Sequence, residues 1–142
     1  MSSRMKAAFT CYLLGVLIAA GFGVVYLFRS EFMPYHAVAV GQSWEALQPA
    51  VRVLVLALMR AVAAGCIAVA FLELVLLFVP FRQGAAWARW AIPVGGLVMC
   101  AGALYAMMLV KLNTPAEPPL FGPVLGAVLL VAGFVLAGER RT

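Results

Sequence analysis

Charged side chains are scarce in this sequence. Only 11% of its 142 residues are Asp, Glu, Lys or Arg, whereas 66% are hydrophobic, and the mean hydropathy is +1.09. Soluble domains are nearer half apolar, so the chain lacks the polar side chains that a water-facing surface needs. This shortage excludes an ordinary soluble domain and predicts a membrane protein.

Histidine and cysteine are also rare, which limits metal and redox chemistry. His36 is the one histidine, and Cys11, Cys66 and Cys100 lie far apart without a C-x-x-C pair. Metal sites normally need three or four protein ligands, and a free cysteine commonly behaves as a small buried hydrophobe. We therefore expect no metal and no cofactor, and we interpret the cysteines as packing residues.

A continuous basic stripe is missing, although the net charge is +5. The ten basic residues occur singly or in pairs at the ends of apolar runs, so a phosphate backbone has nothing to lie along. Basic residues at the ends of membrane-spanning helices can instead bind anionic lipid head groups on the cytoplasmic side. We expect the bilayer as a partner and no nucleic acid.

Four long apolar runs are present, at about residues 7–28, 51–81, 90–110 and 120–137. A bilayer core needs about 20 helical residues, and runs without alternation that must satisfy their backbone groups in lipid are helices. The first run is too long for the apolar part of a signal peptide. The sequence predicts an all-α, integral membrane four-helix bundle, in a single domain that covers residues 1–142.

The distribution of Lys and Arg predicts the orientation of these helices. Six basic residues fall on the side of the two chain ends and three on the opposite side, and the richer side is normally cytoplasmic. We expect both ends in the cytoplasm and a multi-pass location in a plasma membrane. The six are Arg4, Lys6, Arg82, Arg89, Arg140 and Arg141, and the three are Arg29, Arg52 and Lys111.

The first connection, residues 29–50, is the longest polar segment and is expected to form an outer lid of short interfacial helices. Gly41 can divide it into two pieces, Ser43 suits a helix N-cap, and Pro49 suits the first turn of the second span. Its amphipathic side chains are of the kind that collect at membrane interfaces: Tyr35, His36 and Trp44.

Small residues recur at four-residue spacing in three of the spans. Such stripes let helices approach closely in lipid, which favours packing inside the bundle, with docking of another subunit as the alternative. The stripes are Gly15, Ala19 and Gly23, then Ala57, Ala61 and Gly65, then Gly122 and Gly126.

Arg60 and Glu73 are charges embedded in the apolar part of the second run, and ionisable residues inside a membrane are functional candidates. With the inner boundary near Val79, a rise of about 1.5 Å per residue puts Arg60 about 28 Å away, close to the outer interface. We expect Arg60 to anchor the lid through Glu31, Glu45 or a backbone carbonyl. A site for an anionic substrate is the alternative.

Glu73 is the second of these charges and lies about 9 Å inside the inner boundary. At about 100° per residue it is about 220° around the helix from Arg60, so the two cannot pair within one helix. Glu73 is expected either to be protonated or to meet a cation such as Arg89 or Arg82.

His36 lies next to Tyr35 and near Glu31, where an imidazole could shuttle a proton or bind a ligand. No metal-ligand cluster accompanies it. A hydrogen-bonded histidine at the interface is the favoured interpretation.

The segment Phe32-Met-Pro-Tyr-His36, followed by Gly41, Trp44-Glu45 and the stretch Leu56-Ala-Leu-Met-Arg60, resembles a group of short bacterial inner-membrane proteins. The resemblance covers most of the chain. It implies a bacterial four-helix membrane protein and nothing about chemistry, so no functional residue is carried over from it.

The residues favour a structural or accessory protein that binds another membrane protein or its own copy. The alternative is a small-solute transporter or ligand-binding membrane module that acts as an oligomer, and an enzyme with His36 as general base comes third. The candidate residues for a ligand site or for anchoring the lid are Arg60, His36, Tyr35, Glu73, Trp44 and Glu45.

Overall fold

The computed structural model describes residues 2–138, and these contain helices without any strand. Arg140 and Arg141, which contribute to the predicted orientation, lie outside the described residues. The elements are α1 Ser3–Phe28, α2 Pro34–Val40, α3 Pro49–Leu76, the π-helical turn η1 Leu77–Phe81, α4 Ala88–Asn113 and α5 Phe121–Gly138.

Four helical segments among the described residues are long and apolar enough to cross a membrane. They are α1, α3 continued by η1, α4 and α5. The prediction of an all-helical, multi-pass membrane protein is confirmed. The ends of each predicted run differ from those of its helix by only a few residues. The largest difference at one end is at the start of α1, which begins at Ser3. The Ser2 hydroxyl caps this helix by accepting a hydrogen bond from the Met5 N–H at 3.3 Å.

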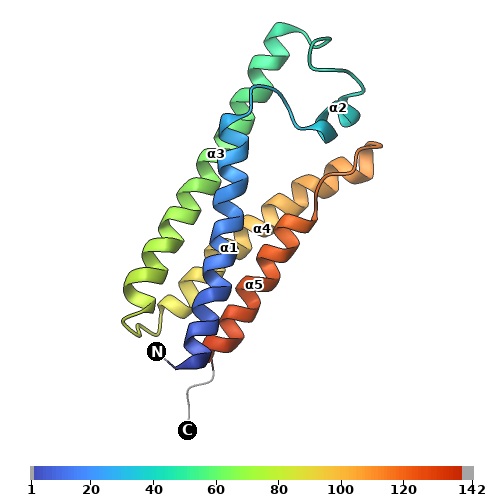
Figure 1. Ribbon diagram of the computed structural model, residues 1–142. Coiled ribbons are helices and arrows are strands. Elements are labelled where there is room, and N and C mark those ends of the chain that lie inside the picture. Colours follow the sequence, from blue (N-terminus) through green and yellow to red (C-terminus); the bar gives the residue numbers. More distant parts are fainter. Residues whose placement is uncertain (1, 139–142) are drawn as a thin grey trace.

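The four long helices form an antiparallel bundle with α1 packed against both α3 and α5 (Figure 1). The start of α1 and the end of α5 lie together, and we call this the terminal end of the bundle. The residues between α1 and α3, which include α2, lie at the opposite end, called the lid end. α3 and α4 are close at the terminal end and diverge toward the lid end (Figure 1).

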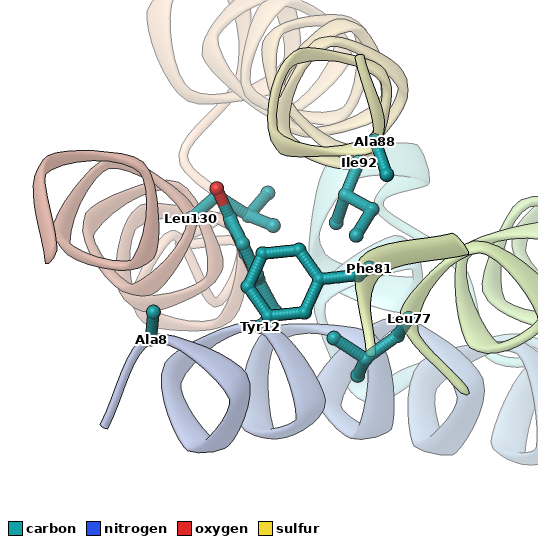
Figure 2. Close-up of a cluster of buried hydrophobic side chains, with 7 residues drawn as sticks. All are labelled: Ala8, Tyr12, Leu77, Phe81, Ala88, Ile92 and Leu130. Atoms are coloured by element: carbon teal, nitrogen blue, oxygen red, sulfur yellow. The ribbon is translucent and has the colours of Figure 1, made fainter. Parts of the chain in front are cut away.

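The terminal end has a closely packed core (Figure 2). Tyr12 from α1 is fully buried and meets Phe81 edge to face, with ring centroids 5.5 Å apart. Its hydroxyl donates a hydrogen bond to the Arg89 carbonyl oxygen at 3.2 Å, so the buried phenol is satisfied. The other members of the core are Ala8, Leu77, Ala88, Ile92 and Leu130.

The π-helical turn at the end of α3 follows from Pro80. Proline has no N–H to donate and its ring crowds the carbonyl of the residue four positions earlier, which favours a local widening of the helix. The turn places Leu77 and Phe81 in the core. The helical path of α3 and η1 then ends at a glycine, Gly84, with φ of 81°.

The lid contains one short helix, where several were expected. Gly41 ends α2 with φ of 72°, a left-handed conformation that suits glycine. The following residues form only a turn, closed by hydrogen bonds from the N–H groups of Ala46 and Leu47 to the carbonyls of Ser43 and Trp44. Ser43 therefore starts a turn and caps no helix, because so few residues before Pro49 cannot sustain one.

Candidate functional site

An aromatic cluster joins the lid to the last turns of α1. The hydroxyl oxygens of Tyr26 and Tyr35 are 2.7 Å apart and share a hydrogen bond. Tyr35 also contacts the His36 ring, with centroids 4.2 Å apart. Burial raises the pKa of Tyr35, while the bond from Tyr26 acts in the opposite direction. These contacts position α2 on the bundle, beside a buried hydrophobic cluster in which Tyr26 packs with Phe32, Leu47, Met59 and Ala63.

His36 takes part in the local structure of α2. Its Nδ1 atom accepts a hydrogen bond from the Met33 N–H at 3.3 Å, at the start of the helix. Burial lowers the pKa of the imidazole, which keeps it neutral and able to accept that bond at neutral pH. Among the described residues, no group of three or more His, Cys, Asp or Glu side chains could hold a metal ion.

Arg52 is the arginine of α3 that holds the lid. Its Nε atom donates to the Leu47 carbonyl at 2.9 Å and its Nη2 atom donates to the Glu45 carbonyl at 3.0 Å. Arg60, expected to be the anchor, is exposed on α3 next to Met59, at the level of Tyr26. No hydrogen bond or ion pair links it to the described part of the lid. Arg52, and not Arg60 as predicted, therefore anchors the lid.

A small cleft of about 210 Å³ lies within the lid itself. Arg29 forms an ion pair with Glu31 at 3.5 Å on its wall, and Trp44 meets Phe32 edge to face with centroids 5.1 Å apart. Glu45 also lines the cleft. The candidate residues Trp44 and Glu45 therefore lie together here, whereas Tyr35 and His36 face the α1 cluster.

A larger cavity of about 510 Å³ lies between the long helices in the half of the bundle nearer the lid. Residues of α1, α3, α4 and α5 line it, and Figure 1 shows α3 and α4 diverging toward the lid end. Its rim on α3 and α4 is exposed, so the cavity is open on the side between these helices. No side chain that lines it is charged: Ile18, Phe22, Val69, Met99, Cys100 and Met107 are among its larger lining residues.

The small-residue stripes serve three different purposes. Gly15 and Gly23 are buried in helix contacts, and a Cβ atom at Gly23 would be only 2.8 Å from Ile67 Cγ1. Gly126 packs beside Cys100, while Gly122 and Ala19 line the cavity. The α3 stripe differs because all three of its members are exposed, and Gly65 also lies on the rim of the cavity. Its members are Ala57, Ala61 and Gly65.

Glu73 is buried one helical turn beyond Val69, the last α3 residue that lines the cavity. It is 4% exposed, and its Oε1 atom has no hydrogen-bond partner among the described residues. Neither expected partner reaches it: Arg82 is exposed beyond η1, and the Arg89 guanidinium lies 4.6 Å from the centre of the Phe134 ring. Glu73 is buried whereas Arg60 is exposed, so the two side chains lie on different faces of α3.

Sequence reasoning missed Gly95 and Gly96, which bring α4 against Glu73. A Cβ atom at Gly96 would be 2.7 Å from Glu73 Oε1 and 2.5 Å from Leu130 Cδ1. The spacing of Gly96 and Cys100 is a small-residue signal of the kind used for the other helices, but only if cysteine is counted as small.

Comparisons of the chain with models of protein families, with curated proteins and with solved structures found no match. The site is therefore interpreted from its own geometry.

Proposed function

We propose that this protein is a small membrane protein that binds a lipophilic molecule from the lipid phase in the cavity between α3 and α4. The observation that carries the proposal is the cavity itself. Its volume of about 510 Å³ falls within the range of about 300–1,000 Å³ typical of ligand sites, and such sites are lined mainly by apolar side chains. The proposal describes binding and assigns no reaction.

Glycines keep this space open. A Cβ atom at Gly65, Gly102 or Gly122 would meet no atom within 4 Å, and all three residues line the cavity. Glycine costs helix stability relative to alanine, and here the cost is not recovered by close packing. An open volume that an occupant fills accounts for these positions.

The closed terminal end favours binding over transport. Between the cavity and that end lies the core around Tyr12, Phe81 and Ile92, which are 3% exposed or less. A solute would have to displace this core to cross the bundle. We therefore favour a bound ligand over the transporter considered as the alternative.

Cavity-filling substitutions test the proposed function. The protein is purified in mild detergent, and retained small molecules are identified and quantified by mass spectrometry. Gly102→Leu should fill the space and remove the retained molecule. Gly21→Leu is the matched control, because Gly21 also faces open space on a membrane-spanning helix but does not line the cavity. Equal retention by wild type and Gly102→Leu would contradict the proposal.

The proposed location is the bacterial inner membrane, with the terminal end in the cytoplasm. Arg4, Lys6, Arg82 and Arg89 lie at or near that end, and cytoplasmic segments are enriched in basic residues. Exposed aromatic side chains of Trp87 and Trp90 suit the adjoining interface. The test starts from a variant without Cys11, Cys66 and Cys100, into which a single cysteine is placed at residue 3 or at residue 42. The two cysteines should be labelled from opposite sides of the membrane. Labelling of residue 3 from outside intact cells would reverse the assignment.

A second candidate function is docking of another membrane helix, from a partner or from a second copy, on α3. The observation that favours it is the exposed stripe Ala57, Ala61 and Gly65, since the other stripes are used inside the bundle. Ala61→Leu should then shift the protein toward the monomer in nanodiscs, whereas Ala101→Leu, at an exposed position of α4, should not. A monomeric wild type that retains no partner would exclude this role.

A further inference from the structure

Glu73 directly adjoins the cavity. It follows Cys66 and Val69 on the same face of α3, and both of these residues line the cavity. From the other wall, Gly95 also lines the cavity, and a Cβ atom on Gly95 would be 3.5 Å from Glu73 Oε1. The carboxyl group therefore lies next to the cavity, one helical turn beyond the α3 residues that line it.

Close packing holds this carboxyl group in place. Gly96 leaves just enough room for it, since a Cβ atom there would be 2.7 Å from Oε1 and would also meet Leu130. Oε1 nevertheless has no hydrogen-bond partner among the described residues. The group is thus positioned by its neighbours, among them the backbone of Gly96, while its Oε1 atom stays without a partner in the described part of the chain.

An unpaired carboxylate in such surroundings is costly. Transfer of a charge into an apolar interior is strongly unfavourable unless the charge is paired. A pair formed in the interior compensates for this cost when its geometry is good. The basic side chains of the neighbouring turn do not supply the partner, because Arg89 lies over Phe134 and Arg82 is exposed. The carboxyl group is then either protonated or paired with a cation carried by the occupant of the cavity.

We propose that the ligand of this cavity is a lipophilic organic cation, whose charged group pairs with Glu73 and whose hydrocarbon part fills the space beside Gly65, Gly102 and Gly122. The inference rests on the proposed function, because it names the chemical class of the ligand for the same cavity. One carboxyl group next to an otherwise uncharged lining matches a ligand with a single positive charge. Such amphiphiles partition into bilayers, from which the open side between α3 and α4 is reached.

Two probes with the same hydrocarbon chain test the charge preference. Decylamine, which is protonated at pH 7, and 1-decanol are titrated calorimetrically into the full-length protein in phosphatidylcholine nanodiscs, and the signal of empty nanodiscs is subtracted. Wild type should bind decylammonium about tenfold more tightly than decanol or better. Glu73→Gln should bind both probes alike, with the affinity for decanol unchanged. Glu117→Gln, at an exposed acid of the α4–α5 connection, is the matched control and should keep the preference.

The outcomes separate this inference from the proposed function. Equal affinities of wild type for the two probes would overturn the cation and leave an apolar site in place. A preference that survives in Glu73→Gln would overturn the role of Glu73. Binding of neither probe by folded wild type would contradict the cavity as a binding site altogether. The comparison of the two probes on wild type decides the matter even if Glu73→Gln fails to fold.

Discussion

The hydroxyl groups of Tyr26 and Tyr35, 2.7 Å apart, form a hydrogen bond between the last turns of α1 and the helix of the lid. The two residues are close in sequence, but the chain turns between them, so the bond fixes the angle at which the lid leaves the bundle. Both phenols are shielded by neighbouring rings. A bond in such a place contributes more than one in water.

Tyr35→Phe is expected to destabilise the lid by about 1 kcal/mol, because it leaves the Tyr26 hydroxyl without its partner. The free energy of unfolding in mixed micelles and hydrogen exchange of residues 33–41 measure the effect. Tyr105→Phe is the control, since Tyr105 is 69% exposed on α4. Tyr26→Phe combined with Tyr35→Phe should cost less than the two single changes together, and strict additivity would argue against a coupled bond.

Acidification is expected to loosen the lid through His36. Burial lowers the pKa of this imidazole in the folded protein, and its neutral form accepts the Met33 N–H bond. The stabilising contribution is therefore complete above the unfolded value of about 6.5 and is lost as pH falls through the lowered folded value. Trp44, packed on Phe32, reports the change by its fluorescence in a Trp87→Phe, Trp90→Phe background.

His36→Asn is the control for this titration. The Asn side chain can offer an acceptor oxygen near the position of Nδ1 but does not titrate. The emission of Trp44 should shift to the red between neutral pH and about pH 5 in the protein with His36, and it should stay constant over that range in His36→Asn. The same shift in both proteins would assign the transition to another group.

Arg52→Gln should release the segment before α3, whereas Arg60→Gln should not. Arg52 donates two hydrogen bonds to lid carbonyls, one of them exposed, and their loss should cost about 1 kcal/mol after allowance for solvent. Limited proteolysis within residues 41–48 should accelerate several-fold in Arg52→Gln only. Faster cleavage in Arg60→Gln would restore Arg60 as the anchor.

The sequence was sufficient to predict the four long helices, because length and apolar composition decide whether a segment can cross a bilayer. It was insufficient for the choice between Arg52 and Arg60. Both are at the lid end of α3, and which one meets the lid depends on the rotation of the helix and the path of the chain before Pro49. Contacts of this kind are set by tertiary packing, which periodicity alone does not encode.

Glu73 shows the same division between what sequence can and cannot predict. A carboxyl group in an apolar run pointed to a functional residue, but its surroundings come from α4 and α5. The glycines that contact it were overlooked because each has only one small neighbour at four-residue spacing, Ala91 for Gly95 and Cys100 for Gly96, and neither pair was counted as a stripe. The empty space beside Gly102 likewise becomes visible only when the directions of α3 and α4 are known.

Gly96→Ala compared with Gly102→Ala tests this arrangement within a single helix. A methyl group at Gly96 would come within 2.5 Å of Leu130 Cδ1 and 2.7 Å of Glu73 Oε1, so these buried side chains or α4 itself would have to shift. Overpacking of this kind typically costs about 1–3 kcal/mol. At Gly102 a methyl group meets nothing within 4 Å, and the higher helix propensity of alanine should leave stability unchanged or slightly increased. Unfolding in mixed micelles should therefore separate the two variants, and equal stabilities would mean that α4 does not approach Glu73 as closely as described.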